Sequence, residues 1–162
     1  MNKVTKKHNI FSILYFVLII ALLISIFFFQ IIKINGYSMF PTFNNNQLVL
    51  LNKIDYKTQN PKRNDIIVFE NYDQLLIKRV IGLPGESIRI TEDGDIYIND
   101  KLYKESLDLE KIIDPGAAIN TITLGSDEYF VLGDNRNNSY DSRFKGVGPV
   151  NKKNIKGKVI TK

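Results

Sequence analysis

Cysteine and tryptophan are absent from this 162-residue chain, and histidine occurs once. Without cysteine, the chain can form no disulfide, no thiol nucleophile and no Cys-ligated zinc or iron–sulfur site. A single histidine excludes a histidine-rich metal site, so any metal site would have to be built from carboxylates. The length fits one domain, since a domain usually takes about 100–200 residues.

Acidic residues are also missing from the first 33 positions, which contain four lysines. This segment holds most of the formal charge of +5, because the remaining residues carry 18 basic and 17 acidic side chains. A nucleic-acid binder would show a basic face on its folded part. The charge distribution therefore argues against nucleic acid as a partner.

A long apolar run is present instead, since residues 10–32 form 23 consecutive positions without a charge. As a helix rising about 1.5 Å per residue, this run could cross the roughly 30 Å hydrocarbon core of a bilayer. A cleaved signal peptide would have an apolar core of only about 7–15 residues and a small-residue cleavage site. We therefore predict an uncleaved transmembrane anchor over 10–32.

Three lysines in the segment 1–9 precede the run, and only Lys33 follows it closely. The positive-inside tendency predicts that 1–9 is a cytoplasmic basic tail and that 33–162 is the extracytoplasmic domain of a single-pass membrane protein. His8 then lies on the cytoplasmic side and can serve no site in the outer domain. A Ser-His-Asp triad is thereby excluded.

The outer domain is predicted to be mostly β, a barrel or sandwich of short antiparallel strands. Short apolar, β-branched runs bounded by Gly, Pro, Asn or Asp predict the strands, and these runs occupy residues 47–54, 65–71, 75–82, 87–100 and 128–134. Leu83-Pro84-Gly85 is typical of a type II turn, while Asp93-Gly94 and Asn99-Asp100 are typical of hairpin connections. Residues 101–124 show weak patterning and are expected to form a less regular segment.

One lysine lies inside an apolar strand. In a strand, side chains alternate between the faces, so Lys78 shares its face with Leu76 and Val80. Apolar surroundings disfavour the ammonium form, and lowering a pKa of 10.4 by about 3 units costs roughly 4 kcal/mol. A lysine neutralised in this way can act as a general base for a serine. The alternative is a half-buried lysine whose stem packs on apolar surface while its head reaches water.

A candidate serine precedes this lysine in a Gly/Pro-bounded turn, GYSMFPT (36–42). Such a turn can expose the Ser38 hydroxyl and direct backbone N–H groups at a developing oxyanion, although an ordinary turn serine is the simpler alternative. A third polar cluster fills residues 133–143. It is an ordered loop that orients a base, a solvated loop, or a weak calcium loop through Asp134, Asn138 and Asp141, although the EF-hand spacing is not met.

These clusters, in this order after an N-terminal anchor, resemble the type I signal peptidases, the membrane-bound Ser/Lys leader peptidases of bacteria, in their compact Gram-positive-like form. GYSMFPT (36–42) resembles the nucleophile motif, and IKRVIGLPGE (77–86) resembles the lysine motif. GDNRNNSYDSR (133–143) is similar to the last conserved motif, and DIIVF (65–69) to the strand before the lysine motif. The match extends over essentially the whole chain and implies a fold of two antiparallel sheets, of the signal-peptidase/LexA-like type, with a small irregular insertion over 101–124.

The resemblance implies a role for each matching residue. Ser38 is the nucleophile, with its backbone N–H in the oxyanion hole, Lys78 is the general base, and Ser139 orients the lysine amine. The residues expected to support the site by ion pairs, hydrogen bonds or the shape of the serine turn are Asp134, Arg79, Asp141, Arg143, Met39 and Pro41. Gly36 stands where some relatives carry a serine as a second oxyanion donor, so no side chain is assigned to that function.

The activity implied by the resemblance is that of a serine endopeptidase without metal or cofactor. It would remove N-terminal signal peptides from exported preproteins after small residues of the A-x-A type, so preproteins and membrane lipid are the expected partners. Phe40, Phe43 and Leu48 lie next to the anchor and are candidates for an exposed apolar face that touches lipid.

Three alternatives come from other classes. The first is a specialised peptidase for one dedicated substrate, and the second is a non-catalytic, membrane-tethered domain that binds peptides. The third is a self-cleaving Ser/Lys regulator of the repressor type. Such regulators carry a DNA-binding helical domain, and the sequence shows a transmembrane run in that place.

Overall fold

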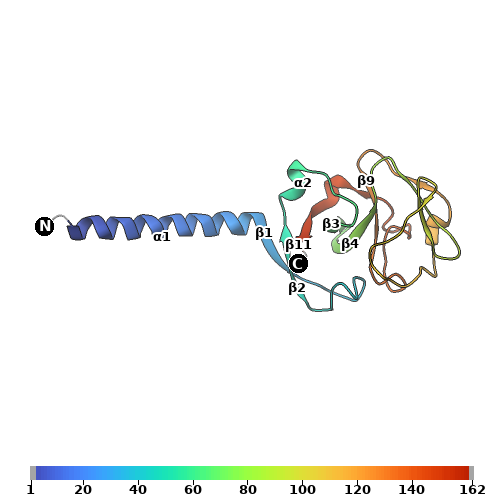
Figure 1. Ribbon diagram of the computed structural model, residues 1–162, viewed down its shortest axis with the longest axis horizontal. Coiled ribbons are helices and arrows are strands. Elements are labelled where there is room, and N and C mark those ends of the chain that lie inside the picture. The colour runs from blue at the N-terminus through green and yellow to red at the C-terminus, as the bar shows by residue number, and fades with distance from the viewer. Residues whose placement is uncertain (1–2, 161–162) are drawn as a thin grey trace.

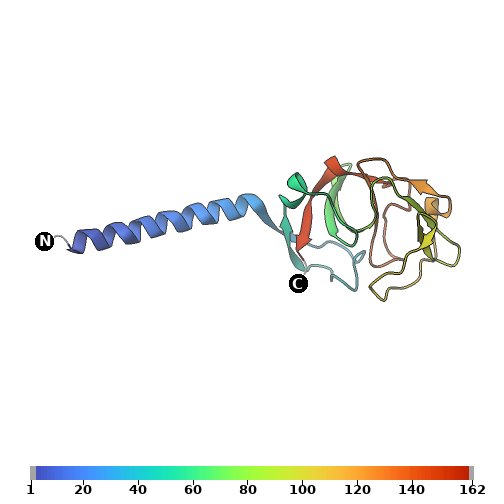
Figure 2. The same cartoon turned by 45° about the horizontal axis from the view of Figure 1, so that its top comes forward.

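The computed structural model describes residues 3–160. A long helix, α1 (Lys3–Phe28), projects from one end of a β-rich domain, as both ribbon views show (Figures 1 and 2). Within it, Ile10–Phe28 has a mean hydropathy of 3.0 and is long enough to cross a bilayer. The predicted basic tail 1–9 lies partly outside the described residues, because positions 1 and 2 are not described.

The apolar run 10–32 does not form one helix. After α1 ends at Phe28, the chain forms strand β1 (Phe29–Lys33), which pairs antiparallel with β2 (Leu48–Asn52). Ile31 is exposed, whereas Ile32 packs against the core. Because β1 carries apolar residues on both faces, its sequence continues that of the helix without a break. The helical part of the predicted anchor is therefore shorter than expected.

The fold is mostly β, as predicted, and consists of two antiparallel sheets. The larger has the strand order β1-β2-β11-β3-β4-β9-β10, and the smaller has the order β7-β6-β5-β8. The other strands of the larger sheet are β3 (Ile66–Asn71), β4 (Gln74–Gly82), β9 (Glu128–Leu132), β10 (Val150–Asn151) and β11 (Ile155–Ile160). The strands of the smaller sheet are β5 (Ser87–Ile90), β6 (Ile96–Ile98), β7 (Lys101–Leu102) and β8 (Ile122–Thr123).

Every predicted strand segment contains an observed strand, and the predicted turns connect them. Gly85 has a φ of +78°, and the Glu86 N–H donates to the Leu83 carbonyl at 3.1 Å, as a type II turn requires. Asn99 and Asp100 have φ values of 50° and 60° in the tight connection between β6 and β7. This is the pattern of a type I′ hairpin turn.

Short helices complete the fold. α2 (Asp55–Thr58) follows β2, and the 3-10 helix η2 (Lys152–Asn154) precedes β11. The predicted insertion 101–124 contains the 3-10 helix η1 (Gly116–Ile119) between the two short strands β7 and β8. The rest of this segment contains no regular helix or strand.

One of the buried apolar clusters lies beneath the serine turn and fixes its position. Met39 and Phe43 of the turn pack there with Ile34, Val49 and other residues of the larger sheet. Phe43 is only 5% exposed, so the prediction that it touches lipid is wrong. The prediction was based on closeness to the anchor in sequence alone. The chain turns tightly before Phe43, where the Phe43 N–H donates to the Met39 carbonyl at 2.9 Å, and the Phe43 side chain enters the core.

Candidate active site

The serine turn follows β1 directly and is held by its own hydrogen bonds. Gly36 has a φ of +94°, a conformation that favours glycine, and its N–H donates to Asn45 Oδ1 at 2.9 Å. The Phe40 N–H donates to the Tyr37 carbonyl at 3.1 Å. Met39, buried in the core, anchors the turn beside Ser38. Pro41, joined to Phe40 by a cis peptide bond, is exposed.

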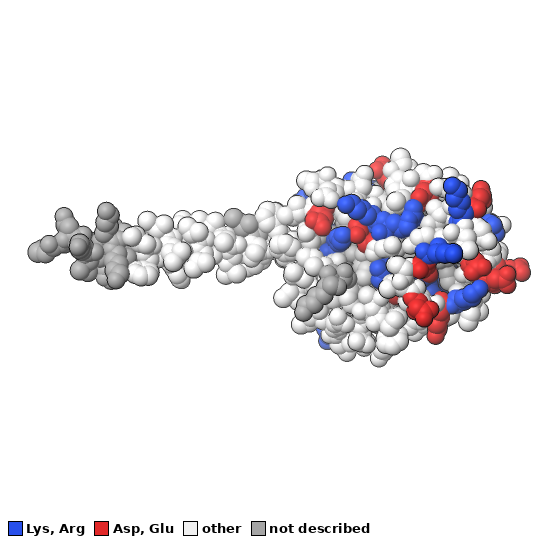
Figure 3. Space-filling model, viewed as in Figure 1, with Lys and Arg blue, Asp and Glu red and all other residues white. Residues whose placement is uncertain are grey.

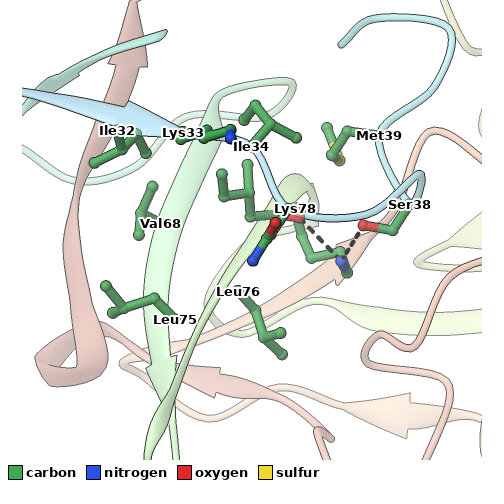
Figure 4. A pocket seen from close by; sticks show the side chains of 11 residues that line it. Ile32, Lys33, Ile34, Ser38, Met39, Val68, Leu75, Leu76 and Lys78 are labelled. Atoms are coloured by element: carbon green, nitrogen blue, oxygen red, sulfur yellow. Dashed lines mark hydrogen bonds between the residues drawn. The ribbon is translucent and has the colours of Figure 1, made fainter. Parts of the chain in front are cut away.

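Lys78 reaches this turn from the middle of β4. Its Nζ donates to Ser38 Oγ at 2.8 Å and to the Ile77 carbonyl at 3.0 Å, as the dashed lines in Figure 4 show. Lys78 is only 3% exposed. The structure thus brings the predicted nucleophile and the predicted base, 40 residues apart in sequence, into direct contact.

Burial sets the protonation of Lys78. Desolvation lowers the pKa of its amine from 10.5 to about 8, while the more distant Asp141 and Asp134 carboxylates act in the opposite direction. At neutral pH a fraction of about one tenth of such amines is already unprotonated. A neutral amine within hydrogen-bond distance of a hydroxyl can accept its proton, which is the arrangement that general-base activation of a serine needs.

The neighbouring residue, Arg79, faces the other way and forms a buried ion pair. Its Nε and Nη2 donate to the two oxygens of Asp134 at 2.8 and 2.6 Å. The Thr42 hydroxyl donates to the same carboxylate and so ties the end of the serine turn to it. Arg79 and Asp134 were predicted to support the site by an ion pair, while Thr42 was not predicted.

A second ion pair organises the polar loop 133–143. Arg143 Nε and Nη2 donate to Asp141 at 2.8 and 3.0 Å, and Asp141 in turn accepts the Gly133 N–H at 3.0 Å. Both residues are at most 2% exposed. Because arginines occupy the carboxylates of Asp134 and Asp141, these groups are engaged in ion pairs, and the calcium-loop alternative loses its ligands.

The polar loop holds the serine turn through Asn135. The Asn135 backbone N–H donates to the Ser38 carbonyl at 3.0 Å, and its side-chain amide donates to the Tyr37 carbonyl at 3.1 Å. These two bonds join segments about a hundred residues apart. They fix the backbone on which the nucleophile sits.

An ion pair between the polar loop 133–143 and the segment 101–124 was not predicted from the sequence. Arg136 is 1% exposed, and its guanidinium donates to both oxygens of Glu105 at 2.5 and 2.6 Å. Its Nε donates to the Gly133 carbonyl at 3.0 Å. The position of Arg136 between Asp134 and Asp141 was a usable signal, whereas Glu105 lies in a segment without any pattern.

Ser139 lies close to Gly133 and does not form the hydrogen bond that the resemblance implies. A Cβ at Gly133 would clash with Ser139 Oγ and with the Ser38 carbonyl oxygen, so only glycine lets these groups meet. Ser139 Oγ is buried and has no hydrogen-bond partner within the described part of the chain. The predicted hydrogen bond to the lysine amine is not formed here, and the orienting role of Ser139 stays a prediction.

A cleft of about 130 Å³ leads to the Ser38–Lys78 pair. Its walls come from the end of β1 and from β3 and β4, and Figure 4 shows how the side chains surround the opening. The apolar residues among them include Ile32, Ile34, Val68, Leu75 and Leu76. The serine hydroxyl therefore lies beside a mostly apolar, open surface.

Comparisons with known proteins identify the family of the chain. The family model described as "Signal peptidase, peptidase S26" matches residues 7–162. Signal peptidase I V of Bacillus subtilis is 39% identical over 137 residues, covering 77% of this chain and 80% of that protein. The probable signal peptidase I-2 of Synechocystis is 38% identical over 142 residues, covering 83% of this chain, and the match spans 63% of the relative's length.

A solved structure also matches the chain. The crystal structure of a signal peptidase I from Enterococcus faecalis matches with a TM-score of 0.50 and 33% sequence identity, covering 64% of this chain and 98% of that chain. Together, the family model, the relatives and this structure show that the chain belongs to the signal peptidase family, peptidase S26.

Proposed function

We propose that the chain is a membrane-anchored serine endopeptidase that uses Ser38 and Lys78 to remove signal peptides from exported preproteins. The observation that carries this proposal is the 2.8 Å contact between Ser38 Oγ and the buried amine of Lys78 at the end of an open cleft. Membership in the signal peptidase family supports the choice of substrate.

The reaction needs only groups that this chain supplies. Lys78 takes the Ser38 proton as Oγ attacks the peptide carbonyl, and the Ser38 backbone N–H donates to the oxyanion. The resulting ammonium returns its proton to the leaving amine, which frees the new N-terminus and leaves an ester on Ser38. A water molecule, deprotonated by the same amine, then hydrolyses the ester. Gly36 offers no side chain for a second oxyanion donor.

Membership in the signal peptidase family supports a preference for small residues before the scissile bond, of the A-x-A type. The walls of the cleft are mostly apolar, which favours apolar over charged side chains at these positions. Ser139 would orient the Lys78 amine once the amine has lost its proton, because the Ser139 hydroxyl is buried and has no other partner among the described residues.

The proposed placement puts α1 in the membrane, residues 1–9 in the cytoplasm and the domain outside. Ser38 follows the last helical residue, Phe28, by ten positions, so it lies at most about 36 Å from the helix end. Exposed apolar residues on and next to the strands that adjoin the helix support contact with lipid; they are Ile31, Leu48, Leu50 and Ile160. In Figure 3 the part of the domain below the helix root is almost free of charged side chains, whereas charges gather on its far part.

The test is cleavage of a purified A-x-A preprotein by the full chain in detergent. Ser38→Ala and Lys78→Ala are expected to abolish cleavage, while Ser106→Ala and Lys104→Ala, at exposed positions, are expected to leave it intact. Cleavage that survives in Ser38→Ala would refute the proposed nucleophile. Failure of the folded wild type on every preprotein would favour a dedicated-substrate peptidase or a peptide-binding domain.

A further inference from the structure

The base of the domain, where α1 leaves it, has two hollows that the proposed catalysis does not use. The first contains Phe27 of α1 and three lysines, Lys53, Lys57 and Lys156. The second is apolar and runs along the root of the helix; its walls include Ile26, Phe29, Ile31 and Leu50. Lys53 lines both hollows, so they adjoin at this residue.

Two of the lysines are tied to the last turn of α1. The Lys53 N–H donates to the Phe28 carbonyl at 3.0 Å, which holds Lys53 at the end of the helix. The Lys57 ammonium lies over the ring of Phe27, 5.8 Å from its centroid. Because Phe27 and Phe28 end the apolar span, these ammonium groups lie at the level of the lipid headgroups when the span is in a bilayer.

Nearby acidic side chains do not neutralise all the lysines of the first hollow. Lys156 is paired with Glu70 at 2.5 Å, and Asp55 accepts a hydrogen bond from Asn52 at 2.8 Å. Lys53 and Lys57 have no ion pair within 4.0 Å anywhere in residues 3–160. Two positive side chains therefore face an interface where phosphate groups are the principal anions.

We propose that the two hollows together form a binding site for one anionic phospholipid. The headgroup phosphate binds Lys53 and Lys57 in the first hollow, and an acyl chain lies along Ile26, Phe29, Ile31 and Leu50 in the second. This site rests on the proposed membrane anchor and is independent of the peptidase reaction. It would hold the domain in a fixed orientation on the membrane surface.

The experiment measures lipid retained by the full chain after purification in detergent. Native mass spectrometry compares retention of added phosphatidylglycerol with that of phosphatidylcholine. The wild type is expected to retain phosphatidylglycerol preferentially. The double variant Lys53→Gln/Lys57→Gln is expected to lose this preference, because each lysine near a membrane surface changes anion affinity about fivefold.

Matched controls separate a built site from general charge. Lys101→Gln/Lys104→Gln removes the same two charges from exposed positions of the insertion and is expected to bind like the wild type. Ile31→Ser is expected to weaken retention of both lipids, because it removes part of the apolar wall.

Three outcomes would overturn the proposal. They are equal retention by the two double variants, wild-type retention by Lys53→Gln/Lys57→Gln, and displacement of phosphatidylglycerol by inorganic phosphate alone. The last outcome would show a phosphate site without a lipid. Since binding is read directly, a chain that binds phosphatidylglycerol but cleaves no preprotein would contradict the proposed peptidase and leave this site standing.

Discussion

The two faces of β4 treat buried positive charge in opposite ways. On one face, Arg79 donates to both oxygens of Asp134 and keeps its charge by pairing with an acid. On the other face, the amine of Lys78 contacts only neutral oxygens, those of Ser38 and Ile77, and its pKa falls to about 8. The two residues are consecutive and are both less than a tenth exposed.

The difference follows from what each side chain can do with a proton. A guanidinium does not deprotonate in proteins, so a buried arginine needs an acid beside it. A lysine amine can respond to burial by losing its proton, so a buried lysine without a contacting acid becomes a base. Strand alternation separates the two environments by one residue, which places a paired guanidinium and an amine of lowered pKa on opposite faces of the same strand.

Replacing Lys78 should give the largest effect, which is on the rate of preprotein cleavage. Lys78→Arg keeps a positive charge but offers a group that cannot accept the Ser38 proton. We expect the rate of preprotein cleavage to fall about 10³-fold or more. The matched control is Arg79→Lys, which keeps one ion pair with Asp134 and should stay within about tenfold of the wild type. Wild-type cleavage by Lys78→Arg would mean that another group is the base.

Removing the acid on the Arg79 face should damage stability. Asp134→Asn leaves a buried guanidinium without its anion, and we expect the free energy of unfolding to fall by about 3–5 kcal/mol. Guanidinium denaturation of the full chain in micelles measures this, followed by the fluorescence of its 8 tyrosines, since tryptophan is absent. Asp95→Asn, which breaks an exposed pair with Lys111, should cost less than about 1 kcal/mol. Equal losses in the two variants would contradict the contrast between the environments.

Removing the amine of Lys78 should raise the free energy of unfolding, whereas removing the acid that pairs with Arg79 should lower it. The pKa of Lys78 is about 8 in the folded chain, against 10.5 ordinarily, so below pH 8 the folded state carries the full cost of burying the ammonium. This cost is about 3 kcal/mol, and it disappears as the pH rises from 8 to 10.5 because the unfolded state then binds the extra proton. Lys78→Met should stabilise by up to about 3 kcal/mol at pH 7 and by less than about 1 kcal/mol at pH 10. A loss of stability at pH 7 would refute this assignment.

The same shift predicts the pH dependence of cleavage. Only the neutral amine accepts the Ser38 proton, so kcat/KM should rise with pH and level off above the Lys78 pKa of about 8. Between pH 7 and the plateau the increase should be about tenfold. Initial rates from pH 6 to 9.5, with a folding check at each pH, measure this profile. A plateau beginning below pH 7, or no plateau before pH 10, would contradict it.

The sequence contained enough to locate the chemistry but not the scaffold that holds it. The Ser38–Lys78 contact and the Arg79–Asp134 pair were predictable, because strand alternation and the resemblance each bear on these residues. The Glu105–Arg136 pair was not, because Glu105 lies in an irregular segment and its partner is 31 residues away. Long-range pairs that involve loops leave no periodic trace in a sequence.

The boundaries of elements were the least predictable feature of the fold. Most of strand β1 was assigned to the anchor, because Phe29, Gln30, Ile31 and Ile32 continue the uncharged run of the helix. Strand β11 was missed, since its lysines and glycine, IKGKVI, obscure the apolar alternation. Both strands flank β2 in the larger sheet, so their identity depended on pairing rather than on local composition.

The smallest effects are expected from alanine substitutions of two serines in the polar loop, Ser139 and Ser142, which should differ in what they change. Ser139 Oγ is buried without a partner, whereas Ser142 Oγ accepts the Val131 N–H at 2.9 Å. Ser139→Ala should leave the free energy of unfolding unchanged or raise it by about 1 kcal/mol, because it removes an unsatisfied buried hydroxyl. If that hydroxyl orients the Lys78 amine during the reaction, kcat should nevertheless fall about tenfold with KM unchanged. Ser142→Ala should lower stability by about 1 kcal/mol and leave kcat unchanged. An unaltered kcat in Ser139→Ala would show that the contacts to Ser38 and Ile77 suffice to place the amine.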